Sequence, residues 1–138
     1  VEGLADAHEL LAEDLRIAAG TVRGDLLRDG VHTGLGNDSL CHGDLGLVAA
    51  LLAAGPALGE TDDLGPRVAR LVADRVLAGD VRPGVPMGVT TPGLMTGSAG
   101  IGYGLLRVAA PERVPDVLTL AAPGADGGRD GRRQGGRR

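Results

Sequence analysis

The stretch "SLCHGDLGLVAALLAA", residues 39–54, decides the fold because a later segment, "GLMTGSAGIGYGLLRVA" at 93–109, repeats its pattern. A constant offset of 54 residues aligns the two segments, and the shared positions are leucines and glycines. The aligned pairs are Leu40 with Leu94, Gly43 with Gly97, Gly46 with Gly100, Leu51 with Leu105 and Leu52 with Leu106. Both segments predict a short apolar helix, at about 43–54 and 98–109. Recurrence at this period predicts stacked helical hairpins.

An amphipathic helix is expected before each apolar segment. Apolar residues recur at three- and four-residue intervals over 4–27, and again from Leu64 to the "LAGD" at 77–80. His8 falls on the apolar face of the first of these helices and is expected in the core. We therefore expect an all-α fold of about two helical hairpins, with the short apolar helices inside and the longer amphipathic ones outside.

Glycine and proline mark the connections between these helices. "RDGVHTGLGNDS" at 28–39, which contains His32, and "VRPGVPMGVTTPG" at 81–93 predict loops. "AGPALG" at 54–59 is expected to end the first apolar helix. The segment 114–120 is the one candidate for extended backbone, and Tyr103 is expected to pack within the last helix.

The composition narrows the class of protein. With 25 glycines, one Tyr and no Phe or Trp, the core must consist of Leu, Val, Ala and Ile. One cysteine excludes an internal disulfide and favours a cytoplasmic location, and no apolar run reaches the roughly 18–20 residues of a membrane span. The amino terminus is acidic rather than signal-like.

The basic residues are all arginines, and five of the 14 lie in the Gly/Arg-rich tail at 124–138. Such a tail buries nothing and is expected to be disordered, which leaves 1–123 as the ordered domain. The rest of the chain is acidic, and the tail has no aromatic residue for base stacking, so we expect no nucleic-acid partner.

The two copies of the repeat differ at Cys41 and His42, where the second copy has Met95 and Thr96. A cysteine at the start of a helix has a lowered thiol pKa, and thiolate and imidazole are the ligands that zinc prefers. An isolated pair is also compatible with a small packed cysteine and a capping histidine, so the residues alone leave both interpretations open. Asp38 and Asp44 flank the pair, either as acceptors for the imidazole N–H or as helix caps.

These motifs resemble a known family. "SLCHGDLGLVAALL" resembles the Cys-His-Gly zinc motif of LanC-like lanthipeptide cyclases, and "PGLMTGSAGIGYGLLRVAAPERVPDVLTL" is similar to the closing segment of class II lanthipeptide synthetases. The resemblance covers about 29–123 and implies part of an α/α toroid, a ring of inner and outer helices with zinc at one rim. Two cysteines and one histidine hold that zinc in the family, and Cys41 and His42 match the last two ligands.

The resemblance also implies an activity. Such lanthionine synthetases add cysteine thiols of a dehydrated leader-core precursor peptide to dehydroalanine or dehydrobutyrine, which forms the lanthionine and methyllanthionine rings of lantibiotics. The partners implied are that peptide and the remainder of the synthetase.

The chain departs from the family pattern in its ligand set. It has no second cysteine and no tryptophan, whereas the family places its first zinc cysteine in a Trp-Cys-x-Gly motif farther upstream. We therefore expect 1–123 to be a C-terminal fragment of the cyclase domain, inactive alone, with no catalytic residue of its own and the third ligand upstream. The alternative is a metal-free helical-repeat module that only binds a partner.

Overall fold

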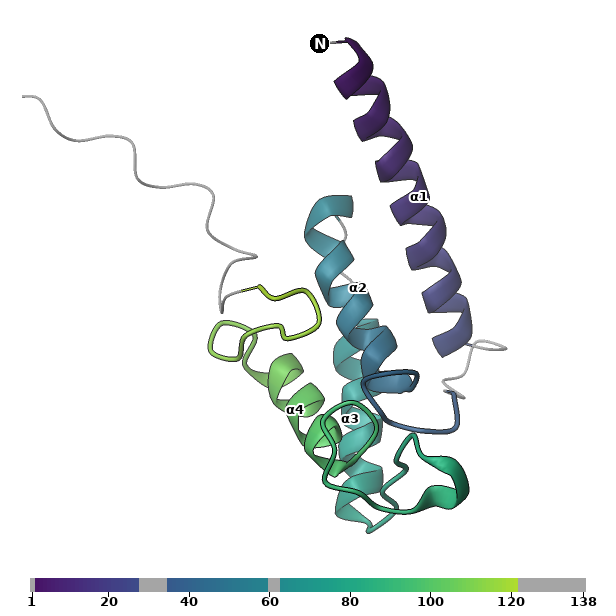
Figure 1. Ribbon diagram of the computed structural model, residues 1–138, viewed down its shortest axis with the longest axis vertical. Helices are drawn as coiled ribbons and strands as arrows, with labels where there is room; N and C mark the ends of the chain where they lie inside the picture. The colour runs from purple at the N-terminus through teal and green to yellow at the C-terminus, as the bar shows by residue number, and fades with distance from the viewer. Residues whose placement is uncertain (1, 28–34, 60–62, 122–138) are drawn as a thin grey trace, which may run out of the picture.

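The computed structural model describes residues 2–27, 35–59 and 63–121, and these ranges are largely helical (Figure 1). The helices are α1 (Glu2–Leu26), α2 (Asp44–Leu58), α3 (Leu64–Leu77) and α4 (Ser98–Ala109), with a 3-10 turn, η2 (Pro86–Gly88), before α4. The all-α fold predicted from the sequence is confirmed. The predictions for His32 and for the tail at 124–138 lie outside the described residues.

The helices pack in the order that a pair of hairpins requires. α2 contacts α1, α3 and α4, and α3 also contacts α4. α1 and α4 lie on opposite sides of α2 (Figure 1). No helix in the described ranges is both long enough and apolar enough to cross a membrane.

The apolar helix α2 runs farther than expected, because it continues through Gly55 and Pro56 to Leu58. Pro56 lies in the last turn, has no N–H to donate to the carbonyl four residues earlier, and is followed by only two more helical residues. Leu58 packs against the core, and Gly59 then ends the helix in a left-handed conformation, with φ of 65° and its N–H donated to the Gly55 carbonyl. α2 has 15 residues and is one residue longer than α3, which has 14. The helices therefore alternate in polarity but not in length.

His8 lies outside the core, which corrects the expectation for this residue. It is exposed, and among the α1 side chains whose burial is described, from Ala7 onward, the fully buried ones are Ala19 and Leu26. The physical reason is the shorter partner: the amino-terminal part of α1 extends beyond the end of α2 (Figure 1).

The core is aliphatic, as the composition requires, and consists of two clusters. One joins α1, α2 and α3, and the other joins α2, α3, α4 and the turn before α2, while Val108 packs against both. The buried members are Ala19, Leu26, Val48, Leu51, Leu64 and Val68 in the first cluster, and Leu40, Leu45, Ala69, Val72 and Ile101 in the second.

The segment after α4 is a compact turn and not the extended strand considered above. The Tyr103 hydroxyl donates to the Pro115 carbonyl at 2.5 Å and accepts from the N–H of Val117 at 2.9 Å. A carboxylate oxygen of Asp116 accepts from the N–H of Leu118 at 2.9 Å. These side chains satisfy the local backbone that a neighbouring strand would otherwise pair.

The sequence repeat is also a structural repeat at the start of α2 and α4. Gly43 and Gly97 cap the two helices with nearly the same backbone angles, φ −122° and ψ −175° for the first, φ −111° and ψ −169° for the second. A Cβ at Gly46 would overlap the Leu40 carbonyl, and a Cβ at Gly100 would overlap the Leu94 carbonyl. Glycine is therefore required where each preceding turn crosses its helix.

We predict that Gly100→Ala lowers the free energy of unfolding by about 1–3 kcal/mol, because the methyl group displaces the Leu94 backbone. The matched control is Gly102→Ala in the same helix, where no described atom lies within 4 Å of the Cβ position. This control should gain up to about 1 kcal/mol from helix propensity. Urea unfolding monitored by circular dichroism compares the two, and equal stability of both variants would contradict the prediction.

Candidate functional site

Cys41 and His42 lie in the turn that leads into α2, and both are exposed. The N–H of Cys41 donates to the carbonyl of Met95 at 2.9 Å. Met95 is the residue that corresponds to Cys41 in the other repeat. The N–H of Gly84 donates to the Thr96 carbonyl at 2.8 Å and joins the loop at 81–88 to the same place. The two repeats thus bring their helix-start turns together at one end of the molecule.

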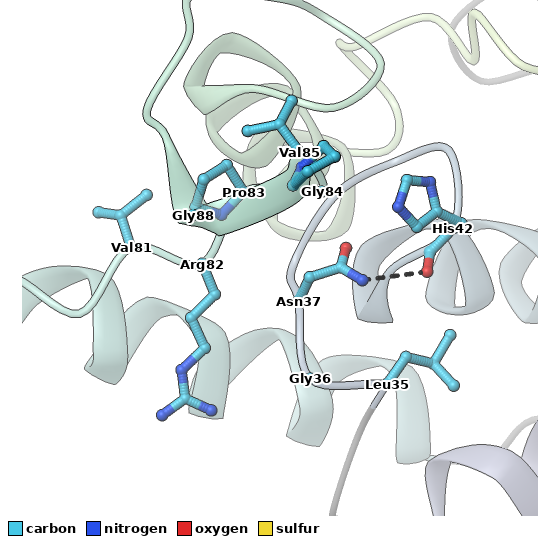
Figure 2. Close-up of a pocket in the computed structure, with 11 residues that line it drawn as sticks. Leu35, Gly36, Asn37, His42, Val81, Arg82, Pro83, Gly84, Val85 and Gly88 are labelled. Atoms are coloured by element: carbon cyan, nitrogen blue, oxygen red, sulfur yellow. Dashed lines mark hydrogen bonds between the residues drawn. The ribbon is translucent and has the colours of Figure 1, made fainter.

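A polar network fixes the shape of the turn around Ser39. Oδ1 of Asn37 accepts from the N–H of Ser39 at 3.1 Å and from its hydroxyl at 2.7 Å. Nδ2 of Asn37 donates to the His42 carbonyl at 3.3 Å, across the turn that carries the Cys-His pair (Figure 2). The buried hydroxyl of Ser39 is therefore satisfied, and the backbone of His42 is held in place.

A cavity of about 510 Å³ lies beside His42, between this turn and the loop at 81–88 (Figure 2). Its walls include Leu35 and Asn37 on one side and Gly84 and Val85 on the other, and Cys41 is not among the lining residues. A Cβ at Gly84 would overlap Ser39 and lie 3.0 Å from Cε1 of His42. The absence of a side chain at Gly84 lets the loop approach the imidazole.

Arg82 lines the same cavity, but its guanidinium points away from His42 (Figure 2). It pairs with Asp80 at 2.5 Å, and this hydrogen bond lowers the pKa of the Asp80 carboxyl. Both partners are exposed, so this pair adds little to stability. The guanidinium of Arg82 is consequently not directed at the imidazole of His42.

Arg75 lies in the last turn of α3 and connects this helix by ion pairs to the segment that carries Cys41 and His42. Its Nη2 donates to Oδ1 of Asp38 and, at 3.2 Å, to Oδ2 of Asp44, and the two carboxylates are almost completely buried. The other oxygen of Asp44 accepts from the N–H of Leu35 at 2.7 Å. One guanidinium thus connects an outer helix, the Cys-His turn and the first residue of α2.

The two aspartates lie beside the Cys-His pair as the sequence suggested, and the structure gives both of them an ion pair with Arg75. A hydrogen bond from the His42 imidazole N–H to either carboxylate stays a prediction. The cap of α2 is Gly43, and Asp44 follows it in the first turn, where a negative charge is favoured by the helix dipole. Burial raises the pKa of the Asp38 carboxyl, while the hydrogen bond and the charge of Arg75 act in the opposite direction.

The sequence reasoning missed Arg75, Asn37, Ser39 and Gly84. For Arg75 a signal was present, because it shares the apolar stripe of α3 with Val68 and Val72, where a charged residue needs a partner. For Gly84 no such signal exists, since its role depends on contacts with residues about 40 positions away.

The residues present suit zinc only in part. Cys41 and His42 supply sulfur and nitrogen donors, both accessible and adjacent. Within the described ranges, however, no group of three or more His, Cys, Asp or Glu side chains lies close enough to hold a metal ion. The described residues therefore offer at this turn fewer donors than the three protein ligands that a catalytic zinc site needs.

Two helical hairpins whose inner helices both begin at a glycine, one of them preceded by an accessible Cys-His pair, define an α/α repeat protein. The chain belongs to the lanthionine synthetase C-like protein family, whose model matches residues 8–119. This match confirms the resemblance to the LanC-like family, and the similarity to class II synthetases stays a prediction. Comparison with curated proteins and with solved structures gives no significant match.

We predict that Arg75→Met lowers the free energy of unfolding by about 3–5 kcal/mol at pH 7, because it leaves buried carboxylates without their cation. Arg75 opposes the raised pKa of Asp38, so its removal raises that pKa further above the unfolded value of 3.8. The folded variant then binds more protons than the unfolded chain, and its stability falls as pH rises through this window.

The loss should accordingly be smaller at pH 4.5 than at pH 7, and urea unfolding at the two pH values measures it. Arg70→Met, on the exposed side of the same helix, is the matched control and should change stability by less than about 0.5 kcal/mol. An equal effect of the two substitutions would exclude a structural role for the Arg75 cluster.

Proposed function

We propose that this chain is the C-terminal part of a zinc-dependent cyclase domain of a lanthionine synthetase, of the class II kind. The reaction is the addition of a precursor-peptide cysteine thiol to dehydroalanine or dehydrobutyrine, which closes a lanthionine or methyllanthionine ring. The observation that carries the proposal is the accessible Cys41-His42 pair at the start of α2, in a chain that belongs to the LanC-like family. The protein would act in the cytoplasm on a dehydrated leader-core peptide.

Cys41 and His42 would hold the metal together with a cysteine from polypeptide upstream of this chain. Zinc, when bound, lowers the pKa of a coordinated peptide thiol and so supplies the thiolate that adds to the dehydrated residue. Two of the protein donors and their setting belong to this chain, and the rest of the synthetase completes the set.

The other residues of the site would position these two ligands. Arg75 ties the turn to α3 through Asp38 and Asp44, and Asn37 holds the backbone of His42. These contacts use the backbone of the turn and residues other than Cys41 and His42, so the two ligands would need little reorganisation on binding. A rigid turn of this kind favours a defined coordination geometry.

The cavity beside His42 is the proposed place of the peptide. Its volume of about 510 Å³ accommodates a few residues, and Leu35 and Val85 contribute apolar surface. Dehydroalanine and dehydrobutyrine, the residues to which the thiol adds, are small and uncharged. The apolar side chains of Leu35 and Val85, in the cavity that His42 also lines, suit such residues.

A second function has one observation in its favour. The described residues hold no group of three metal ligands, which is compatible with a metal-free helical-repeat module that only binds a peptide or protein. Such a module would not depend on the thiol of Cys41. The two functions therefore differ in what happens when Cys41 or His42 is replaced.

We predict that the chain alone binds zinc with a Kd above about 1 μM at pH 7, because two protein ligands give less than the roughly 10–16 kcal/mol of complete structural sites. Competition with a chromogenic chelator measures this affinity. Cys41→Ala and His42→Ala should each remove the residual binding, whereas His8→Ala, at an exposed histidine on α1, should not. Sub-nanomolar affinity would mean that the chain contains a complete site.

The catalytic proposal predicts ring formation only when the upstream cysteine is present. A chain extended at its amino terminus to include that cysteine should cyclise a dehydrated peptide, and the chain alone should not exceed the rate in buffer. Mass spectrometry after alkylation of free thiols counts the rings formed.

Cys41→Ala and His42→Ala in the extended protein should abolish ring formation, and His8→Ala should preserve it. A binding module would instead retain peptide affinity in all three variants and form no rings in any of them. That outcome would replace the cyclase proposal with the second function.

A further inference from the structure

Gly84 is a glycine that its own backbone conformation does not require. Two other glycines that line the cavity beside His42, Gly36 and Gly88, have positive φ angles of 81° and 67°, which favour glycine. Gly84 lines the same cavity but does not adopt this left-handed conformation. The requirement for glycine at position 84 therefore comes from the space around it.

That space is occupied by the turn that carries the Cys-His pair. A Cβ at position 84 would overlap the hydroxyl of Ser39, lie 2.8 Å from Cβ of Ser39 and lie 3.0 Å from Cε1 of His42. The loop backbone thus lies against the edge of the imidazole, at the carbon between its two nitrogens (Figure 2). Rotamers that would swing the ring of His42 through this loop are excluded by overlap.

The loop is anchored on both sides of this contact. The carbonyl of Arg82 accepts from the N–H of Asp38 at 2.7 Å, and the N–H of Gly84 donates to the carbonyl of Thr96 at 2.8 Å. Asp38 precedes the Cys-His pair in the first repeat, and Thr96 is the counterpart of His42 in the second. The backbone that faces the imidazole is therefore held by both repeats.

We propose that Gly84 is a positioning residue for His42. The docked backbone at Gly84 holds the imidazole in one orientation, and Thr96 of the second repeat holds Gly84 in turn. The inference rests on the proposed function for the role of His42 as a metal ligand. It gives the second repeat a part in a site whose donor side chains belong to the first.

A restrained ring favours binding because its rotational freedom is already lost before a ligand arrives. Immobilising one side chain on binding typically weakens affinity by about 2- to 10-fold. The contact at Gly84 should contribute an effect of this size to the affinity of the chain for zinc.

The metal-free full chain tests the restraint directly. Carbon-13 relaxation of imidazole Cε1 measures the mobility of each histidine ring, and His8, exposed on α1, is the internal reference. We expect an order parameter near about 0.85 for the ring of His42 and below about 0.6 for that of His8. A nuclear Overhauser effect should connect Hε1 of His42 to the α-protons of Gly84. The His42→Ala variant identifies the signal.

Gly84→Ala should release the ring, because the new methyl group displaces the loop from Ser39. The order parameter of His42 should fall towards that of His8, and the zinc affinity measured by chelator competition should fall by about 2- to 10-fold. Ser39→Gly in the same chain removes both atoms of Ser39 that the methyl group approaches, so it should restore both readouts.

Two matched controls separate positioning from loss of stability. Val48→Ala truncates a completely buried side chain in the cluster that joins α1, α2 and α3. It should lower stability but leave the ring mobility and the zinc affinity unchanged. Ser39→Gly alone should also leave both unchanged, since the loop keeps its place.

A ring of His42 as mobile as that of His8 in the unmodified chain would overturn the proposal, even if Gly84→Ala fails to fold. A ring that stays ordered in folded Gly84→Ala would also overturn it, because other contacts would then hold the imidazole. A ring that Gly84→Ala releases, in a chain whose zinc binding is unaffected by Cys41→Ala and His42→Ala, would confirm the restraint by Gly84. That last result would contradict the proposed function instead.

Discussion

The structure depends on the close approach of a backbone turn to the first turn of each inner helix. At Gly46 and Gly100 the carbonyl of a leucine occupies the space of a Cβ, so the chain can cross the helix there only at glycine. This contact fixes the direction in which the preceding turn leaves the helix. The positions of Cys41 and His42 follow from it, since they lie in that turn, between Leu40 and the Gly43 cap.

A core without Phe or Trp has to obtain its contact area from short distances between helices. Glycine and alanine permit such distances, and the buried aliphatic side chains fill what remains. The cost is that glycine weakens a helix, so α2 and α4 rely on their neighbours. Arg75 adds a polar tie to this apolar arrangement and anchors the end of α3 to the start of α2 through Asp38 and Asp44.

Local periodicity and the 54-residue offset were enough to predict the four helices and the aliphatic core. The predicted end of α2 at about residue 54 was wrong because the helix continues past Pro56 to Leu58, and the left-handed Gly59 is the residue that ends it. The predicted burial of His8 was wrong because an amphipathic pattern does not reveal the length of the helix that packs against it. Arg75 and Gly84 act through residues distant in sequence, and a single chain does not encode such contacts in any short motif.

The two repeats differ at polar positions of the turn before each helix and share the residues that pack closely at the helix starts. The shared positions are the glycines and leucines of the helix starts, whereas Asn37 and Cys41-His42 are replaced by Thr91 and Met95-Thr96. Equivalent backbone hydrogen bonds, from the Asp44 N–H to the Asn37 carbonyl and from the Ser98 N–H to the Thr91 carbonyl, show that this exchange leaves the fold of the turn unchanged. A turn whose shape is set by glycine and backbone contacts can change its exposed side chains at little cost in stability. One copy can therefore carry the exposed Cys-His pair while the backbone of the other copy hydrogen-bonds to it.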